Sequence, residues 1–450
     1  MARPATIHVC SSCAHSEPRW MGQCPGCGEW NTLVEERAPQ AAPSGRVRVP
    51  EVAAKPIVLR DVRGEQAERL ETGVGELDRV LGGGLVPGSL VLLGGAPGIG
   101  KSTLTGMALG NLAGAGRSVL YVSGEESAAQ IRLRHERLET DGCRALDVPV
   151  LAETDLGGVL AAIGSIRPAV CVIDSVQTLS DSALTGAPGS VGQVREVAAQ
   201  LMRTCKPLGT AVIVVGHVTK EGSIAGPRVL EHLVDAVLQF EGERERTYRT
   251  LRALKNRFGS TNETGVFEMR EGGLVEVLDP SARFVGEATG KPGSVVLCAM
   301  EGSRPLLVEV QALVHPSELE PPRRVCTGID RNRLALVLAV LGRHAKLGTG
   351  SADVFVNVVG GIRVDEPGAD LAVALAVASA ARGVPLGSRE QPLACFGELG
   401  LTGELRSVGH AERRLEEAAK FGLDPVIHPG EHRTIGRALR AALAGAAEAV

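Results

Sequence analysis

A short glycine-rich loop near residue 100 constrains the fold of this chain more than any other feature. Its residues match the pattern G-x-x-x-x-G-K-[ST] and are Gly95, Ala96, Pro97, Gly98, Ile99, Gly100, Lys101, Ser102 and Thr103. Residues 89–93 before it predict a short buried strand, and residues 103–112 after it have the apolar spacing of a helix. In that context the loop's N–H groups face phosphate oxygens at the positive end of the helix. The loop predicts nucleoside triphosphate binding, with Lys101 on the β- and γ-phosphates and Ser102 as a magnesium ligand.

The length and composition set the outer limits. A chain of 450 residues is too long for one ordinary core, so two or three domains are expected. The net charge of −4 excludes a globally basic protein, and an aromatic content of 2% disfavours base stacking as a main mode of nucleic-acid binding. The sequence has no apolar run of membrane-spanning length and no signal-like start. We therefore expect a soluble cytoplasmic protein with no membrane partner.

Four of the ten cysteines lie close to the N-terminus. Cys10-x-x-Cys13 and Cys24-x-x-Cys27 form two pairs that together offer four thiolates, the donor set of a closed structural zinc site. Two disulfides or a redox C-x-x-C are the alternatives. A reducing setting and the lack of a following βαβ pattern disfavour both. The sequence therefore predicts a zinc module.

The chain divides into four predicted segments. Residues 1–34 form the zinc module, and the Ala-, Pro- and Arg-rich residues 35–56 form a linker. Residues 57–283 alternate short apolar strands with helical segments, the pattern of a mostly parallel α/β sheet. Residues 284–450 start a new α+β pattern.

Two strand ends in the α/β segment carry carboxylates. The strand at residues 118–122 leads to Glu125 and Glu126, either of which could deprotonate an attacking water, with Glu125 preferred. A helix-capping pair is the alternative for these glutamates. The apolar strand at 169–173 ends in Asp174, which resembles a Walker B aspartate and is expected near the magnesium ion.

Three further residues have the chemistry of γ-phosphate contacts. His217 follows the strand at 211–215 and is a candidate sensor, or a plain strand-terminal histidine. Lys255 and Arg257 are separated by one residue, so in an extended segment they point the same way, as a phosphate clamp requires. A solvated basic strand end is the alternative reading of this pair.

Other regions suit contact with a nucleic-acid backbone. The small-residue loops at 180–193 and 220–227 allow close approach. Basic residues also gather in the C-terminal part, where a solvated helix face is the alternative to phosphate binding; they are Arg323, Arg324, Arg331, Arg333, Arg343, His344 and Lys346.

Residues 71–259 resemble the RecA-type core of the bacterial RadA (Sms) recombination and repair proteins. The resemblance is carried by the leader at 81–88, the phosphate loop, and the segments 124–127, 216–222 and 255–259. It implies a RecA-like P-loop ATPase that uses ATP and Mg²⁺. It further implies a homo-hexameric ring motor on single-stranded and branched DNA, which promotes branch migration alongside the RecA recombinase. Lys255 and Arg257 would then act on the neighbouring subunit's nucleotide.

The C-terminal segment resembles the Lon protease catalytic domain, notably in residues 356–361 and 398–406. Lon enzymes use a Ser–Lys dyad, in which the lysine activates the serine. Here the serine position is Gly368 and the lysine position is Glu412, so we expect a scaffold without protease activity. An ATP-dependent protease is therefore a disfavoured alternative. An ATP-switched binding platform of the circadian-clock type remains open.

Overall fold

The structure is a computed structural model of the 450-residue chain. It describes residues 6–10, 15–37, 58, 68–140, 142–184, 186–218, 224–225, 229–242, 248–270, 272–286 and 288–447. The predicted linker at 35–56 lies mostly outside these residues, as does Cys13. By its internal contacts the chain separates into two compact units. The first comprises Met1–Glu241, Thr250–Thr261 and Met269–Glu276, and the second comprises Gly242–Arg249, Asn262–Glu268 and Val277–Val450.

The N-terminal ribbon is a small antiparallel sheet. Its central strand β1 (Thr6–Cys10) pairs with β2 (Ser16–Glu17) on one side and with β3 (Leu33–Arg37) on the other. Only Cys10, Cys24 and Leu33 form its buried apolar cluster among the described residues. Such a core is too small to stabilise a fold alone, so the ribbon needs a second source of stability.

A nine-stranded sheet organises the first unit, in the order β14-β13-β12-β11-β4-β8-β7-β5-β6. The six strands from β11 to β6 in this order are parallel, and β12 is antiparallel to β11. The strands are β4 (Leu90–Gly95), β5 (Val119–Ser123), β6 (Val150–Ala152), β7 (Val170–Asp174), β8 (Ala211–Val215), β11 (Ala236–Glu241), β12 (Tyr248–Asn256), β13 (Thr264–Arg270) and β14 (Gly273–Glu276). A short pair, β9 (His217–Val218) and β10 (Ile224–Ala225), follows β8.

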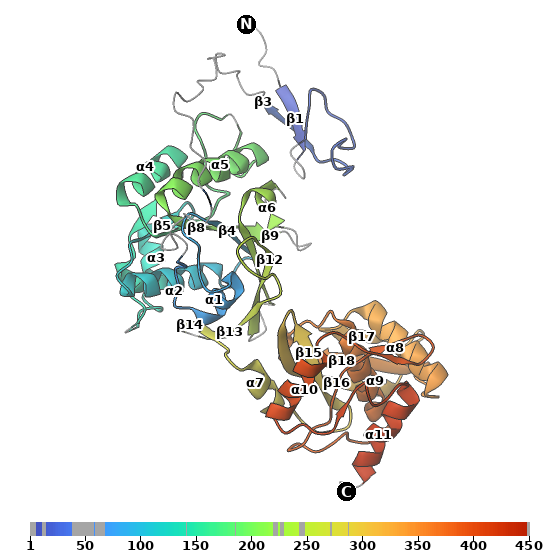
Figure 1. The fold of residues 1–450 in the computed structure, drawn as a ribbon. Coiled ribbons are helices and arrows are strands. Elements are labelled where there is room, and N and C mark those ends of the chain that lie inside the picture. Colours follow the sequence, from blue (N-terminus) through green and yellow to red (C-terminus); the bar gives the residue numbers. More distant parts are fainter. Residues whose placement is uncertain are drawn as a thin grey trace. The chain divides into compact units, whose positions relative to one another are not determined.

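Helices cover both faces of this sheet (Figure 1). On one face lie α4 (Leu156–Ile166) and α5 (Val191–Leu208), packed on Leu90, Leu92 and their neighbours in one buried cluster. The other face carries α2 (Lys101–Gly114), because successive strand residues point to opposite sides. The remaining helices are α1 (Gly75–Leu81), α3 (Ala128–His135) and α6 (Val229–Leu233). The predicted mostly parallel α/β core is confirmed.

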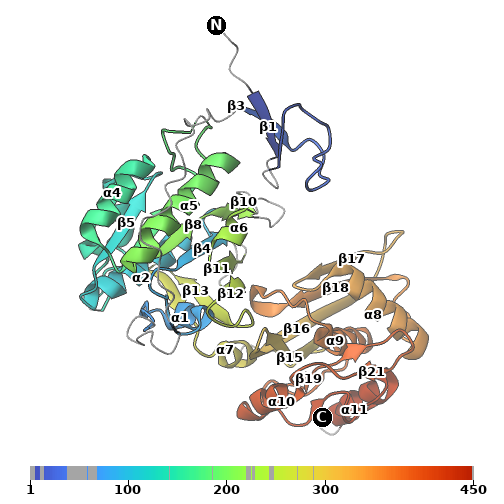
Figure 2. The same ribbon diagram turned by 45° about the horizontal axis from the view of Figure 1, so that its top comes forward.

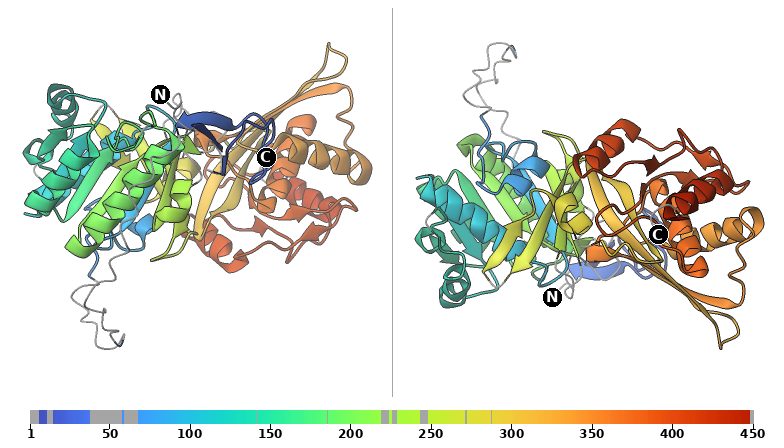
Figure 3. Two further views of the ribbon diagram at one scale, coloured as in Figure 1. Left: turned by 90° about the horizontal axis from the view of Figure 1, so that it is seen from above. Right: turned by 90° about the horizontal axis from the view of Figure 1, so that it is seen from below.

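The second unit is built on a six-stranded twisted sheet in the order β17-β18-β16-β15-β19-β22 (Figures 2 and 3). Its strands are β15 (Ser294–Glu301), β16 (Arg304–Pro316), β17 (Arg324–Thr327), β18 (Ala352–Val358), β19 (Ala394–Cys395) and β22 (Val426–Ile427). β20 (Glu398–Leu399) and β21 (Leu405–Arg406) form a separate hairpin. The helices are α7 (Pro280–Gly286), α8 (Arg331–His344), α9 (Asp370–Arg382), α10 (Ala411–Lys420) and α11 (Ile435–Ala447).

Helix α9 is the centre of this unit. Ten consecutive residues from Asp370 to Ser379 are buried, so the helix is covered all round. It packs on β15 and β16 and is itself contacted by α8 and α11. The sheet and helices agree with the α+β pattern predicted for the C-terminal segment. In the part of the chain that the structure describes, no helix combines the length and apolarity needed to span a bilayer.

Candidate functional site

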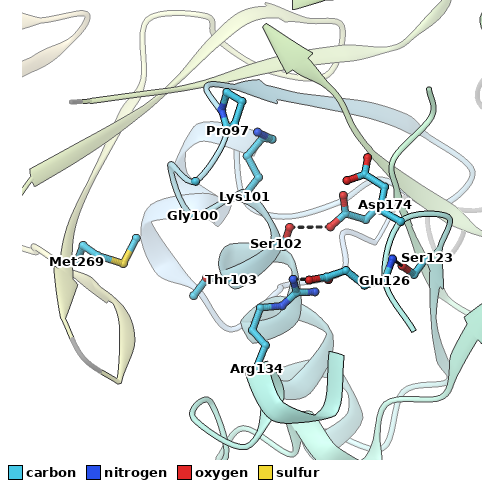
Figure 4. A pocket seen from close by; sticks show the side chains of 12 residues that line it. Pro97, Gly100, Lys101, Ser102, Thr103, Ser123, Glu126, Arg134, Asp174 and Met269 are labelled. Carbon is cyan, nitrogen blue, oxygen red and sulfur yellow. Dashed lines mark hydrogen bonds and ion pairs between the residues drawn. The ribbon is translucent and has the colours of Figure 1, made fainter. Parts of the chain in front are cut away.

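The phosphate loop connects β4 to the start of α2 and borders a cavity of about 310 Å³. Lys101, Ser102 and Asp174 line this cavity (Figure 4), and Glu125 also lines it. Gly100 has φ +117°, and a Cβ there would lie 2.9 Å from Met269 Cε, so only glycine suits the turn into the helix. The first N–H groups of α2 have no partners within the helix and form an anion site at the cavity.

Backbone carbonyl groups of the phosphate loop hold the Lys101 side chain. Its Nζ donates to the carbonyl oxygens of Gly95 at 2.8 Å and Ala96 at 3.0 Å. Burial lowers the pKa of the ammonium, while the carboxylates of Asp174 and Glu125 act in the opposite direction. A phosphate in the cavity would supply the negative charge that favours the ammonium. This geometry suits the predicted phosphate contact.

Ser102 and Asp174 come together although 72 residues separate them in sequence. The Ser102 hydroxyl donates to Asp174 Oδ2 at 2.6 Å, which leaves its lone pairs available for a cation. Asp174 ends β7, and its register partners are Ser123 on β5 and Val215 on β8. Three parallel strands therefore deliver their carboxyl ends to the phosphate loop, as ligand sites in such sheets require.

The two adjacent glutamates have different partners. Glu125 Oε1 accepts a hydrogen bond of 2.5 Å from the hydroxyl of Ser175, the residue that follows Asp174. Glu126 is ion-paired with Arg134 on α3, with Nη1 and Oε2 2.6 Å apart. Ser127 caps α3, so the capping role considered for the glutamates belongs to the serine. Both carboxylates line the cavity. The partner of Glu125 is Ser175, next to Asp174, so Glu125 is held on the Asp174 side of the cavity.

The cysteine cluster has the dimensions of a metal site. The Sγ atoms of Cys10, Cys24 and Cys27 lie within 4.8 Å of one another, and those of Cys10 and Cys27 are 3.6 Å apart. A tetrahedron of thiolates about 2.3 Å from a zinc ion has edges of about 3.8 Å, whereas a disulfide is about 2.05 Å long. The residues present therefore fit zinc and do not fit a disulfide. Cys13, the fourth predicted ligand, lies outside the described residues.

Comparison with known proteins identifies the family. Residues 54–223 match the AAA domain family, and residues 8–35 match the rubredoxin metal binding domain family. The chain is 50% identical to the DNA repair protein RadA of Bacillus subtilis, covering 95% of this chain and 93% of that protein. It is 47% identical to the DNA repair protein RadA of Listeria monocytogenes, covering 98% and 99%. The chain belongs to the RadA family of DNA repair proteins.

The family match establishes the cofactors of this RadA-family protein. They are ATP with Mg²⁺ at the P-loop ATPase core and Zn²⁺ at the ribbon. A solved KaiC-like protein, PH0186 from Pyrococcus horikoshii, aligns with 47% of this chain and 99% of its own at 20% identity, with a TM-score of 0.39. That likeness is too loose to bear on function.

Lys255 and Arg257 lie at the edge of the sheet opposite the phosphate loop. Asn256, between them, pairs with Ala236 at the start of β11, whose register partner is Val91 near the start of β4. The phosphate loop begins at Gly95, the other end of β4, about 13 Å away at roughly 3.3 Å per residue. Neither cation is among the residues that line the cavity. They are therefore not brought together with their own protomer's nucleotide site.

Local contacts define where these two cations point. Lys255 Nζ donates to the carbonyl oxygens of Glu231 at 2.7 Å and Val234 at 2.8 Å, at the end of α6. Arg257 Nη1 is 3.0 Å from Asp235 Oδ1, and its side chain remains 53% exposed. Arg257 is thus oriented by Asp235 without being buried, as a residue that contacts a partner requires.

Other predicted contacts are only partly described. The backbone of His217 pairs with Ala225 in the β9–β10 hairpin, while its side chain lies outside the described residues, as does most of the loop at 220–227. The loop at 180–193 is more firmly tied than its composition suggests. The buried amide of Gln193 accepts from Asp181 N at 2.8 Å and donates to Asp181 O at 3.1 Å and Gly186 O at 3.0 Å.

In the second unit, ion pairs fill the position corresponding to a protease site. Gly368 is buried before α9, and a Cβ there would lie 3.0 Å from Arg414 Nη1 and 3.1 Å from Glu366 Oε2. Arg414 and Glu366 are themselves ion-paired. Glu412 is exposed on the first turn of α10. The structure provides neither a nucleophile nor a base at these positions.

Two of the basic residues grouped by sequence serve the fold of the second unit. Arg333, which is half-buried, forms an ion pair with buried Asp370, with Nε and Oδ1 2.5 Å apart. Arg324 donates to the backbone oxygens of Ala352 and Thr349. Sequence reasoning counted both toward a phosphate-binding patch. It missed that their partners lie 25 to 37 residues away.

Sequence reasoning also missed Tyr121 and Arg134 in the nucleotide site. Arg134 lines the cavity, and the Tyr121 hydroxyl donates to Asp174 Oδ2 at 2.6 Å. One available signal was the position of Tyr121, a rare tyrosine in the apolar strand β5. A buried tyrosine needs a hydrogen-bond partner for its hydroxyl, so a polar group near it could have been expected.

Proposed function

We propose that this chain is a DNA-stimulated ATPase that works as a homo-hexameric ring on single-stranded and branched DNA. In homologous recombination and DNA repair it promotes branch migration of recombination intermediates alongside the RecA recombinase. The observation that carries the proposal is the separation of the phosphate loop from Lys255 and Arg257 across the sheet. Its relatives are named DNA repair proteins, which supports the DNA context.

Because Arg257 and the phosphate loop of one protomer lie apart, a complete site for hydrolysis would need two protomers. Arg257 is exposed and held by Asp235 at the edge of the sheet, too far from the phosphate loop to reach its own γ-phosphate. A neighbouring protomer in a ring would receive it. A guanidinium added from outside stabilises the charge that develops during phosphoryl transfer, an effect of about 10³- to 10⁵-fold for an arginine finger. Hydrolysis would then depend on the ring.

Within one protomer, the cavity residues divide the work of hydrolysis. Lys101 contacts the β- and γ-phosphates, and the Ser102 hydroxyl, oriented by Asp174, offers its lone pairs to the magnesium ion. Bound magnesium supplies charge neutralisation between the phosphates. Glu125, held by Ser175, takes the proton of the attacking water. Glu126 is the weaker candidate for this role because Arg134 neutralises it.

A protease function has no support in the second unit. Gly368 carries no nucleophile, and the Arg414–Glu366 ion pair occupies the space beside it. Acyl transfer needs both a nucleophile and a base within hydrogen-bond reach. The second unit therefore serves the ring as a scaffold, with its exposed basic residues as DNA contacts of the sequence-independent kind.

The test is to measure particle mass and ATP turnover together, with ATP and with or without single-stranded DNA. We expect a hexamer and a turnover rate that DNA increases severalfold. Arg257→Ala should bind ATP normally but lose hydrolysis, and mixing it with Lys101→Ala protomers should restore part of the rate. In such mixed rings, a Lys101→Ala protomer supplies the intact Arg257 to a neighbour with an intact loop. Turnover indifferent to DNA, or no restoration in mixed rings, would contradict the proposal.

A further inference from the structure

A continuous set of hydrogen bonds joins the two acidic sides of the nucleotide site. It begins at Ser102, whose hydroxyl donates to Asp174 Oδ2, the oxygen that also accepts from the Tyr121 hydroxyl at 2.6 Å. Arg134 Nη2 donates to the Tyr121 oxygen at 3.0 Å, and Arg134 Nη1 donates to Glu126 Oε2 at 2.6 Å. Tyr121 and Arg134 thus connect the end of β7 to the glutamates after β5.

The direction of each bond follows from the donors available. A guanidinium can only donate, so the Tyr121 oxygen must accept from Arg134. Its single proton is therefore directed to Asp174. Burial raises the pKa of the Tyr121 hydroxyl well above its ordinary value, which agrees with this donor role. The set consequently has one arrangement of protons.

This arrangement distinguishes the two oxygens of Asp174. Oδ2 accepts from both Ser102 and Tyr121, whereas Oδ1 has no hydrogen-bond donor among the described residues. Oδ1 is therefore the oxygen left for the water shell of a magnesium ion. Loss of the Tyr121 hydroxyl would remove one of the two bonds that fix the carboxylate's rotation.

Arg134 has a parallel effect on the glutamates. Its side chain is 24% exposed, and its ion pair holds Glu126 beside α3. Glu125 meanwhile accepts from Ser175 beside Asp174. Two adjacent carboxylates are thereby given separate partners on separate elements. Without Arg134, Glu126 would be a second anion that competes for the same water and repels the phosphates.

We propose that Tyr121 and Arg134 are positioning residues for ATP hydrolysis, which orient Asp174 toward magnesium and keep Glu126 apart from the water that Glu125 activates. This role rests on the proposed ATPase function. The packing around Tyr121 suits it. The side chain has no exposed surface, and its ring meets that of His135 edge-on with centroids 5.7 Å apart. A side chain packed on all sides has little room to move, so Tyr121 can hold its hydroxyl in one place.

The test uses Tyr121→Phe, which removes only the hydroxyl, and Arg134→Lys, which keeps the charge but not the forked geometry. The control is Arg132→Lys, on the same helix, where an exposed arginine pairs with exposed Glu136. Binding of a fluorescent ATP analogue is titrated against magnesium and repeated without magnesium, and single-turnover hydrolysis and thermal unfolding are measured alongside. The full-length protein is used throughout.

We expect Tyr121→Phe to raise the magnesium concentration for half-maximal binding about fivefold and to slow hydrolysis about tenfold, the effect of one hydrogen bond to a charged group. Arg134→Lys should slow hydrolysis about tenfold. The double variant should lose more than either single variant but less than the product of the two effects, because the residues hold different carboxylates and are also bonded to each other. Binding without magnesium and the melting temperature should stay at parental values, and the control should match the parent throughout.

Parental magnesium dependence and hydrolysis in both variants would overturn the proposal. So would equal losses of binding with and without magnesium together with a lower melting temperature, since these indicate a purely structural role. If the parent protein turned over no ATP, the proposed function would fail separately. The magnesium titration would still decide whether Tyr121 orients Asp174.

Discussion

The nucleotide cavity and the surroundings of Gly368 are built alike, each at the start of a buried helix, yet they treat their charges differently. In the first unit, Lys101, Asp174 and the adjacent glutamates face a cavity of about 310 Å³. In the second unit, Arg414 and Glu366 face each other, and a Cβ on Gly368 would meet both. The charged groups at the first site have partners of their own but still border an open cavity that can take a ligand, whereas Arg414 and Glu366 fill the space between them.

Most hydrogen-bond donors of the Arg414 guanidinium group have acceptors. Its side chain is 2% exposed; besides Glu366, Nη1 donates to Cys298 O at 2.6 Å and Nε donates to Gly409 O at 3.0 Å. Glu366 Oε1 also accepts from Met300 N at 2.6 Å. These bonds join β15, the turn before α9 and α10. Lys101, in contrast, donates only to loop carbonyls within the part of the chain that the structure describes, and burial lowers its pKa.

The largest effect on ATP hydrolysis is expected from a substitution in the nucleotide cavity. Lys101→Ala should reduce ATP hydrolysis about a thousandfold, because the phosphates lose the cation that stabilises their developing charge. The melting temperature should change little, because the hydrogen bonds that Lys101 forms with described residues go to its own loop. Single-turnover hydrolysis and thermal unfolding measure the two quantities. Lys206→Ala, on the exposed end of α5, is the control and should retain the parental rate. Parental turnover in Lys101→Ala would reject the phosphate-loop assignment.

The converse change is Arg414→Met in the second unit. It should lower the free energy of unfolding of that unit by about 3–5 kcal/mol, because Glu366 and two carbonyl oxygens lose a buried partner. Binding of ATP should stay within twofold of the parent. Urea unfolding gives the free energy, and hydrogen exchange in α9 locates it.

Arg413→Met is the matched control, since Arg413 precedes Arg414 on α10 and is exposed. It should cost less than about 1 kcal/mol. Equal costs at both positions would mean that the Arg414–Glu366 ion pair does not hold the unit together. The contrast with the nucleotide cavity would then be lost.

Sequence reasoning located correctly the elements that depend on local spacing. The phosphate loop, the strand ending in Asp174 and the cysteine pairs are each defined within a few residues. It failed where a side chain's role depends on a distant partner. Arg333 belongs to Asp370, and Tyr121 belongs to Asp174, 53 residues away. No periodicity or motif encodes such pairs, because they arise only when strands and helices are placed side by side.

The far edge of the sheet illustrates the same limit. The spacing of Lys255 and Arg257 was readable from sequence, but Arg257 lies in the turn after β12 and not in the strand itself. Their distance from the phosphate loop required the strand register of β12, β11 and β4. In the second unit, the replacement of the dyad by Gly368 and Glu412 was readable as well. That Arg414 and Glu366 fill the space was not, since 48 residues separate them.

Restoring the dyad tests whether the second site is closed. Gly368→Ser combined with Glu412→Lys should produce no cleavage of casein, because the Arg414–Glu366 ion pair remains in the space beside the new serine. The added side chain should cost about 1–3 kcal/mol of stability through overcrowding. Gly409→Ser is the matched control, since a Cβ there would meet no atom within 4 Å. Cleavage of casein by the double variant would show that the site can still accept a substrate.

Removal of zinc from the ribbon is expected to have the smallest effect on catalysis. The metal stabilises the ribbon, as the Arg414–Glu366 ion pair stabilises the second unit. A zinc-selective chelator, with magnesium in excess, should release the structure around Cys10, Cys24 and Cys27 while ATP turnover stays within about twofold. The chain's two tryptophans, Trp20 and Trp30, both lie in the ribbon, so tryptophan fluorescence reports on it alone.

The two indoles are 57% and 69% exposed, so their emission maximum should move little. Their fluorescence anisotropy should fall as the segment loses its fixed shape. A Cys24→Ser variant should start from the lower anisotropy and not respond to the chelator. If turnover fell tenfold on zinc removal, the ribbon would be part of the catalytic assembly. The ribbon could then no longer be counted among the parts of the protein that only support the nucleotide cavity.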